Sequence, residues 1–333
     1  MKATALAFPN IALVKYWGKR DEKLFLPQNS SVSVTLDAFF VKSTIEFSEK
    51  YKKDILISNG KRIKENSIEY SQYLEPFLEK ARKLSKKNLR AKIKTESNFP
   101  KSAGFASSAA FFCSLALAIN KALNLNLDKK NLTILSRMGS GSACRSVYGG
   151  FVEWKRGKKK DGSDSFCIQI ANENWWPDLR IVICQVSHKE KKIKSRKGMA
   201  QTVKTCPFYH CWLKTIDDDI KQIKKAIFEK NFSLLGKITE KNCLKFHALT
   251  FTTQPPIIYW EPATLEILKK IIDWRNKGIE SYFTIDAGPQ VKILCLKNSL
   301  KRLLNNLRKI SKIEKIFISK IGPNAKIIKD HLF

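Results

Sequence analysis

Residues 10–36 read NIALVKYWGKRDEKLFLPQNSSVSVTL, an apolar start and an alternating SVSVTL end separated by a cluster of positive charge. Lys15, Lys19 and Arg20 surround the aromatic pair Tyr16 and Trp17. A strand that only fills a core has no need of a lysine at this point, although a lysine stem can also lie along a surface with its head in water. The pattern leaves open whether Lys15 meets a ligand or lies along the surface, and Lys19 and Arg20 are interpreted as loop charges.

Length and charge limit the possible classes of protein. The chain has 333 residues and is 43% hydrophobic, so it can bury a sizeable core, and we predict two domains, residues 1–180 and 181–333. The formal net charge of +32, from 62 Lys and Arg against 30 Asp and Glu, is typical of nucleic-acid binders. The lysines are scattered along the chain, however, which favours solvated faces. We therefore expect no nucleic-acid partner and keep a basic nucleic-acid-binding protein as a remote alternative.

Cysteine placement and the N-terminus bear on the cellular compartment. Eight cysteines lie mostly within apolar segments, with no C-x-x-C pair, and CPFYHC at residues 206–211 lacks the spacing of a zinc site. Pro9 and Asn10 break the apolar N-terminal segment before it reaches the length of a signal peptide or membrane span. The sequence predicts a reduced cytoplasmic protein without a membrane partner.

Hydrophobic periodicity predicts a mixture of strands and helices without strict alternation. This is typical of an α+β fold, a mixed α/β sandwich. We expect strands at residues 31–36, 41–47, 54–60, 89–97, around Val152, 179–187, 291–296 and 315–322, and helices at residues 68–85, after the small-residue loop that follows Pro100, and at 127–137, within 215–249, 261–278 and 299–310.

The first motif that carries chemistry is PKSAGFASSAA, residues 100–110. Gly104 and the small residues Ala106, Ser107 and Ser108 allow backbone N–H groups to converge at the start of a helix, where peptide dipoles favour negative charge. The sequence predicts a phosphate-binding turn, with serine hydroxyls available to a Mg²⁺ that bridges phosphates. It is not a Walker A loop, and small residues at such a turn can also serve packing alone.

The second motif is GSGSACRS, residues 139–146. Its glycines, including Gly141, free the backbone, Ser140 and Ser142 supply hydroxyls, and Arg145 supplies a planar fork for carboxylate or phosphate. Two anion-binding helix starts in one half of the chain suggest two anionic ligands. A serine helix cap beside a surface arginine is the alternative interpretation.

The third motif is SYFTIDAGP, residues 281–289. Asp286 stands between the apolar Ile285 and the small pair Ala287 and Gly288, a poor context for a surface charge. A carboxylate at the end of a strand that faces a cleft makes a good general base. An Asx-type turn before Gly288 is the structural alternative.

Together these motifs resemble the mevalonate diphosphate decarboxylase family of the GHMP kinase superfamily. The resemblance spans nearly the whole chain and rests on residues 10–36, NFPKSAGFASSAA, RMGSGSACRSVYGGFVEW, SRKGM, HALTFTTQPPIIYW and YFTIDAGP in this order. It implies a GHMP kinase-like two-lobed fold, with an N-terminal lobe like ribosomal protein S5 domain 2. It also implies a homodimer that uses ATP and Mg²⁺ to phosphorylate the tertiary 3-hydroxyl of mevalonate 5-diphosphate. Loss of that phosphate with CO₂ then gives isopentenyl diphosphate.

The resemblance also implies roles for individual residues. Asp286 would orient or deprotonate the 3-hydroxyl, Lys15 would act with it, and Arg145 would clamp the carboxylate until it leaves. The implied substrate contacts are Tyr16, Ser140, Gly141, Ser142, Arg145, Ser195, Arg196 and Met199. The implied nucleotide contacts are Gly104, Ala106, Ser107, Ser108 and Lys192, with Ser108 also the candidate for Mg²⁺.

Two related enzymes remain alternatives within the superfamily. One is a decarboxylase of mevalonate 5-phosphate, and the other is a small-molecule kinase that stops after phosphorylation. Lys15, Arg145 and Asp286 together favour the decarboxylase, and Arg196, Lys192 and Lys15 favour the diphosphate. Phe105 stands where the family usually has leucine, which is a packing change, and no role is transferred to Arg62.

Overall fold

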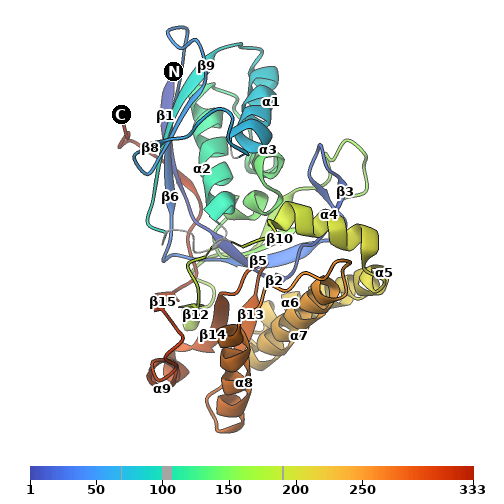
Figure 1. Ribbon diagram of the computed structural model, residues 1–333. Helices are drawn as coiled ribbons and strands as arrows, with labels where there is room; N and C mark the ends of the chain where they lie inside the picture. The colour runs from blue at the N-terminus through green and yellow to red at the C-terminus, as the bar shows by residue number, and fades with distance from the viewer. Residues whose placement is uncertain (69, 100–106, 190) are drawn as a thin grey trace.

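The computed structural model describes residues 1–68, 70–99, 107–189 and 191–333 (Figure 1). Its strands are β1 (Lys2–Ala7), β2 (Asn10–Val14), β3 (Lys19–Asp21), β4 (Leu26–Pro27), β5 (Ser31–Thr35), β6 (Val41–Ser48), β7 (Ile55–Ser58), β8 (Lys61–Arg62), β9 (Arg90–Ser97), β10 (Phe151–Trp154), β11 (Cys167–Ala171), β12 (Leu179–Gln185), β13 (Ser281–Ile285), β14 (Val291–Leu296), β15 (Lys315–Ser319) and β16 (Lys326–Ile328). Its α-helices are α1 (Glu75–Ser85), α2 (Ser107–Ala122), α3 (Lys129–Gly139), α4 (Ser195–Thr205), α5 (Tyr209–Lys214), α6 (Ile216–Phe228), α7 (Phe232–Phe251), α8 (Pro262–Asn276) and α9 (Lys297–Leu307).

The first lobe is built on a six-stranded sheet in the order β16-β1-β6-β9-β7-β8. Figure 1 shows α1, α2 and α3 on one side of this sheet. Alternating residues such as Ala5, Ile45 and Ile93 face the helices and join Phe77 and Leu115 in one core cluster. The helix α2 is apolar along nearly its whole length because it lies in the middle of this core.

A four-stranded sheet in the order β11-β10-β5-β2 lies between the two lobes (Figure 1). All five residues of β2 are buried, and Ile11 and Leu13 pack into a cluster shared with α6 and α7. The apolar start of the motif at residues 10–36 is therefore central to the molecule. Its end at Val14 places Lys15 beside the second lobe.

The second lobe has an antiparallel sheet in the order β13-β14-β12-β15. Ile181 and Leu294 face the cluster of α6 and α7, whereas Val182 and Ile293 face the cluster of α8 and α9. Because the sheet is covered on both faces, β12 is an unbroken buried strand. This explains why its sequence shows no alternation of apolar and polar residues.

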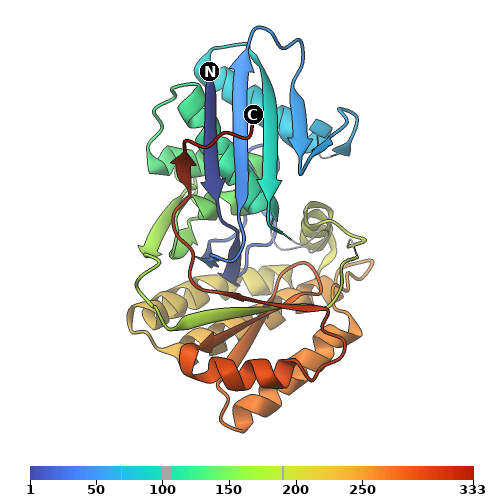
Figure 2. The same ribbon diagram turned by 90° about the vertical axis from the view of Figure 1, so that its left-hand side faces the viewer.

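The last described strand returns to the first lobe. Strand β16 pairs with β1, and Lys2 Nζ donates to the main-chain oxygen of Phe333 at 2.8 Å, so the two ends of the chain lie side by side (Figure 2). The division of the chain at residue 180 stays a prediction.

The α+β class is confirmed, and most predicted elements are present with shifted ends. The helix predicted at residues 68–85 contains the π-helical segment Tyr70–Leu74 directly before α1, and the helical region 215–249 is two helices. Asn231 caps the second of them by accepting from the amide of Leu234. Helices α4 and α5 were not predicted. Among the described residues, no helix has the length and apolar character needed to span a membrane.

Candidate functional site

The centre of the candidate site is a carboxylate held between two buried lysines. Asp286 follows directly after β13, Lys15 follows β2, and Lys292 belongs to β14. Lys15 Nζ lies 2.7 Å from Asp286 Oδ1, and Lys292 Nζ lies 3.3 Å from Asp286 Oδ2. The lysine side chains are 3% and 2% exposed. One negative charge, on a side chain that is itself 28% exposed, thus lies between two positive charges on buried lysines.

This arrangement controls the ionisation of the carboxyl group. Burial alone would raise the pKa of Asp286, but the ammonium groups of Lys15 and Lys292 outweigh burial and hold that pKa well below its usual range. Burial and the neighbouring Lys15 lower the pKa of Lys292, which Asp286 partly restores. Asp286 is therefore an ionised hydrogen-bond acceptor rather than a neutral acid at physiological pH.

The backbone of Lys15 is fixed by side chains instead of by a strand ladder. Its amide donates to Asn242 Oδ1 at 2.8 Å, and its carbonyl accepts from Asn29 Nδ2 at 2.8 Å. Asn242 in turn donates to Asp219 Oδ2 at 2.7 Å. Because two asparagines satisfy the buried peptide groups, the chain can leave β2 here and direct the lysine toward Asp286.

Two further groups lie next to this carboxylate. Lys191 Nζ donates to Ser195 Oγ and to the carbonyl of Ala287, both at 2.9 Å, and burial lowers the pKa of Lys191 to about 8. His247 is fully buried, with Nε2 3.3 Å from the carbonyl of Ile285. Burial, aided by Lys15, lowers the pKa of His247 to about 3, so its ring is neutral.

Arg145 is a further cation of the candidate site, and it is almost fully buried. Its Nε donates to Asn10 Oδ1 at 3.1 Å, and its Nη1 donates to Ser31 Oγ at 2.8 Å. Asn10 also donates to the carbonyl of Ser142 at 3.1 Å. The guanidinium is therefore fixed between β2, β5 and the 3₁₀ helix Gly141–Val147, rather than being a surface charge.

Tyr16 connects Arg145 with the Lys15 region. Its ring meets Trp154 edge-on with centroids 4.7 Å apart, and a Cβ on Gly141 would lie 3.0 Å from it. The glycine thus permits close packing of the loop on the tyrosine. Burial raises the pKa of Tyr16, and its hydroxyl has no hydrogen-bond partner among the described residues. Such a buried hydroxyl is available to a ligand.

A third group of cations surrounds the ring of Phe25. Lys19 Nζ, Lys80 Nζ and the Arg196 guanidinium lie 4.8, 5.3 and 4.5 Å from the centre of the ring. Arg196 also stacks on Tyr73 at 3.8 Å. Lys19 is only 8% exposed and pairs with Glu22, so its interpretation as a solvated loop charge is wrong. Several cations share few carboxylates here, which is typical of an anion site.

Arg196 links this third group to the second motif. Its Nη2 donates to the carbonyl of Gly139 at 2.8 Å, directly before Ser140. The structure thus places Gly141, Arg145 and Arg196 around Tyr16, which directly follows Lys15 in the chain.

The remaining predicted contacts are less closely grouped. Ser195 starts α4 and binds Lys191, Met199 is buried in the apolar cluster with Trp17, and Lys192 is exposed. Ser107 and Ser108 are exposed in the first turn of α2. Gly104 and Ala106 lie outside the described residues.

Sequence reasoning missed Lys292 and Lys191. A lysine inside the apolar strand VKILCL is a signal for a paired buried charge, because lysine is almost never buried alone. The run KEKKIKSRK, by contrast, contains several lysines and gives no basis for choosing Lys191 over Lys192.

Both halves of the chain match families of known proteins. Residues 7–167 match a family model described as the diphosphomevalonate decarboxylase-like N-terminal domain, and residues 181–328 match the mevalonate 5-diphosphate decarboxylase C-terminal domain. The diphosphomevalonate decarboxylase of Candida albicans is 39% identical over 320 residues, covering 92% of this chain and 88% of that protein.

Solved structures share the fold over the full length. The mevalonate diphosphate decarboxylase from Enterococcus faecalis is 38% identical with a TM-score of 0.92, covering 99% of both chains. A structure described as MDDEF in complex with MVAPP, AMPPCP and magnesium is 40% identical with a TM-score of 0.93, again covering 99% of both chains. The fold is accordingly GHMP kinase-like. From the two family models and the full-length relatives, we conclude that the chain belongs to the diphosphomevalonate decarboxylase family.

Proposed function

We propose that this protein converts mevalonate 5-diphosphate and ATP into isopentenyl diphosphate, ADP, phosphate and CO₂. The observation that carries the proposal is the ionised Asp286 held between Lys15 and Lys292. We assign the separate cation Arg145 to a carboxylate, and Lys19 and Arg196 to a diphosphate. A substrate with both of these anions, meeting a nucleotide triphosphate, concentrates negative charge in one place. Cations and dipoles that are already in position offset the repulsion.

Asp286 receives the 3-hydroxyl of the substrate in this proposal. Both of its oxygens retain lone pairs beside the lysines, so one can accept the hydrogen bond of the hydroxyl and direct its oxygen toward the phosphoryl group. Its low basicity suits an orienting role, because phosphoryl transfer depends mainly on positioning and electrostatics. As the new oxygen–phosphorus bond forms, the bond between that phosphorus and the ADP oxygen breaks. The hydroxyl proton passes late along the hydrogen bond to Asp286, which releases it to water.

Arg145 receives the carboxylate of the substrate. Asn10 and Ser31 hold its guanidinium, so a planar pair of donors faces the carboxylate without reorganisation. When the 3-phosphate departs, the bond between C1 and C2 breaks, its electron pair forms the C2–C3 double bond, and C1 leaves as CO₂. The arginine thus binds a charge that disappears in the reaction.

Tyr16, Lys19 and Arg196 receive the diphosphate. Tyr16 offers a hydroxyl without a partner among the described residues, and the two cations converge near Phe25. More than one cation in this group favours a diphosphate over a monophosphate, since each additional phosphate adds negative charge.

The residues present also fit ATP and Mg²⁺. The exposed Ser107 and Ser108 lie at the N-terminal end of α2, which favours phosphate, and Ser108 would supply a hydroxyl to the metal. No cluster of three or more His, Cys, Asp or Glu in the described parts of the chain suits a metal, so the phosphates would supply most ligands. The bound nucleotide and metal supply the transferred phosphoryl group and neutralise its charge. Lys191, which bridges Ser195 and Ala287, is a better placed cation for these phosphates than the exposed Lys192.

The test is a side-by-side assay of ADP and CO₂ with mevalonate 5-diphosphate, mevalonate 5-phosphate and mevalonate. The proposal predicts equal amounts of ADP and CO₂, fastest with the diphosphate. ADP without CO₂ would indicate a kinase, and preference for the monophosphate would indicate the related decarboxylase. The homodimer and the cytoplasmic location remain predictions.

A further inference from the structure

Lys292 has no assigned role, yet it is among the largest fully buried side chains of the protein. In the antiparallel pair of β13 and β14, it lies opposite Thr284, two residues before Asp286. Residues two apart share one face of a strand, so the register directs Lys292 toward the carboxylate that follows. Its ion-pair partner in the structure is Asp286 Oδ2, at 3.3 Å.

A buried ammonium group is strongly unfavourable unless it is paired. Lys15 already neutralises Asp286 and binds its other oxygen, so a second lysine leaves an excess positive charge in the pocket. A residue needed only for packing would be apolar here, like its strand neighbours Val291 and Ile293. The position of Lys292 therefore calls for an explanation based on the carboxylate.

We propose that Lys292 is a positioning residue for Asp286. One hydrogen bond from Lys15 leaves the carboxylate free to turn about its Cβ–Cγ bond. A second cation on the opposite oxygen stops this rotation and fixes the lone pair that receives the reacting hydroxyl. The same cation keeps the carboxylate ionised while the anionic substrates approach. This inference rests on the proposed function, because it concerns the group assigned to the hydroxyl.

Other ionisable groups face the carboxylate from each neighbouring element. These are Lys15 after β2, Lys191 before α4, and Cys243 and His247 on α7. Burial keeps His247 neutral and raises the pKa of Cys243, so neither supplies charge near neutral pH. Lys15 and Lys191 are cations of other elements and remain in place when Lys292 is replaced.

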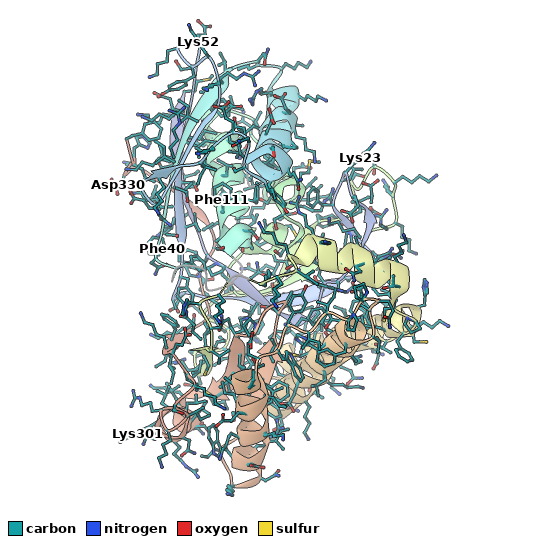
Figure 3. All side chains as sticks on the ribbon, in the orientation of Figure 1. Lys23, Phe40, Lys52, Phe111, Lys301 and Asp330 are labelled. Carbon is teal, nitrogen blue, oxygen red and sulfur yellow. The ribbon has the colours of Figure 1, made fainter. Side chains whose placement is uncertain are left out.

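The experiment compares Lys292→Met, which removes charge and donors, with Lys292→Gln, which retains a donor without charge. Lys301→Met is the control, because Lys301 is exposed on α9 (Figure 3). We expect Lys292→Met to lower kcat by about ten- to a hundredfold, since small misplacements of reacting groups have effects of this size. KM values for both substrates should stay within about twofold, because the interaction acts after binding. Lys292→Gln should recover part of kcat.

The pH dependence separates positioning from a merely structural role. In both Lys292 variants the acid limb of kcat should move to higher pH than in the wild type, because the pKa of Asp286 rises when one of its two cations is lost. Carbon-13 NMR of carboxyl-labelled aspartate, assigned with Asp286→Asn, should show the same upward change without any turnover. If Lys292→Met does not unfold cooperatively, the pH profile of kcat and the NMR titration are measured on Lys292→Gln instead.

The inference is overturned if both variants keep the wild-type kcat and pH profile, or if the Asp286 carboxyl signal titrates as in the wild type. Failure of the proposed function has a different signature, because the wild-type protein itself would then release no CO₂. The NMR titration would still report on Lys292 in that case.

Discussion

Lys15 Nζ lies 2.7 Å from Asp286 Oδ1, although 271 positions separate the two residues in the chain. The lysine comes from the end of β2 and the aspartate from the end of β13, so the contact joins the sheet between the lobes to the sheet of the second lobe. An anionic substrate bound here, as proposed, would meet groups from both sheets. The interruption of the N-terminal apolar segment by Lys15 is explained by this contact.

Replacement of Asp286 by Asn should change stability in a pH-dependent way. The folded pKa of Asp286 lies below its unfolded value of about 4, so its stabilising contribution is complete above that value and lost as pH falls through the folded pKa. We expect Asp286→Asn to be less stable than the wild type by about 3 kcal/mol at neutral pH, because two lysines lose their partner. Urea unfolding should show the difference shrinking below pH ~4. A difference that stays constant with pH would contradict the ion-pair explanation.

Arg145→Lys should reduce kcat/KM for the diphosphate substrate by about ten- to a hundredfold, the loss expected for one charge-assisted hydrogen bond. Lysine keeps the charge but cannot reproduce the planar fork held by Asn10 and Ser31. Ser31→Ala is the matched variant, since it removes one support and leaves the guanidinium. Its effect should be clearly smaller, and steady-state kinetics of CO₂ release will rank the two. Equal activity of Arg145→Lys and the wild type would exclude the carboxylate clamp.

Lys19→Met should raise KM for mevalonate 5-diphosphate by about tenfold or more, with a smaller effect on the monophosphate. Lys19 is buried beside Phe25, where it is one of the cations available to the terminal phosphate. Lys23→Met is the control, because Lys23 is exposed on the same hairpin (Figure 3). An equal rise in KM for both substrates, or a rise in KM with Lys23→Met, would show that the diphosphate does not bind beside Lys19.

Gly236→Ala should destabilise the protein by about 1–3 kcal/mol, although alanine favours helices. A Cβ at Gly236 in α7 would lie 1.9 Å from the Tyr282 ring in β13, so helix and strand would have to separate. Lys237→Ala, on the exposed side of the same helix, should change stability by less than about 0.5 kcal/mol. Thermal unfolding followed by circular dichroism gives both values. If Gly236→Ala leaves stability unchanged, α7 and β13 can separate without cost and the prediction is wrong.

The sequence predicted the α+β class. It also predicted the candidate residues that lie at the end of a strand or at the start of a helix. Asp286, Lys15 and Arg145 could be singled out from the sequence because each is a charged residue within an apolar or small-residue segment. Lys292 was missed because the strand VKILCL was interpreted by its apolar majority, and its partner lies across a strand pair. Helix α4 was missed because SRKGMAQTVKT contains glycine and threonines, whose low helix propensity is outweighed by tertiary packing. Helix α5 was missed because its six residues, YHCWLK, are too few to show a helical period.

The burial of Lys19 could not be predicted from its neighbours in sequence. Lys19 lies over Phe25 together with Lys80 of α1 and Arg196 of α4, and these residues come together only in the fold. The sequence likewise could not select Lys191 over Lys192, since only the structure shows which lysine reaches Ser195. Contacts between residues that are far apart in the chain leave no periodic pattern in the sequence.

The most direct test of the central claim, that Asp286 is the group beside the reacting hydroxyl, is CO₂ and ADP release by Asp286→Asn, with nucleotide affinity measured in parallel. We predict that turnover falls by about a thousandfold, the size expected for loss of a catalytic carboxylate, while the dissociation constant of the nucleotide stays within about twofold. Turnover close to that of the wild type, or loss of nucleotide binding in this variant, would contradict the account.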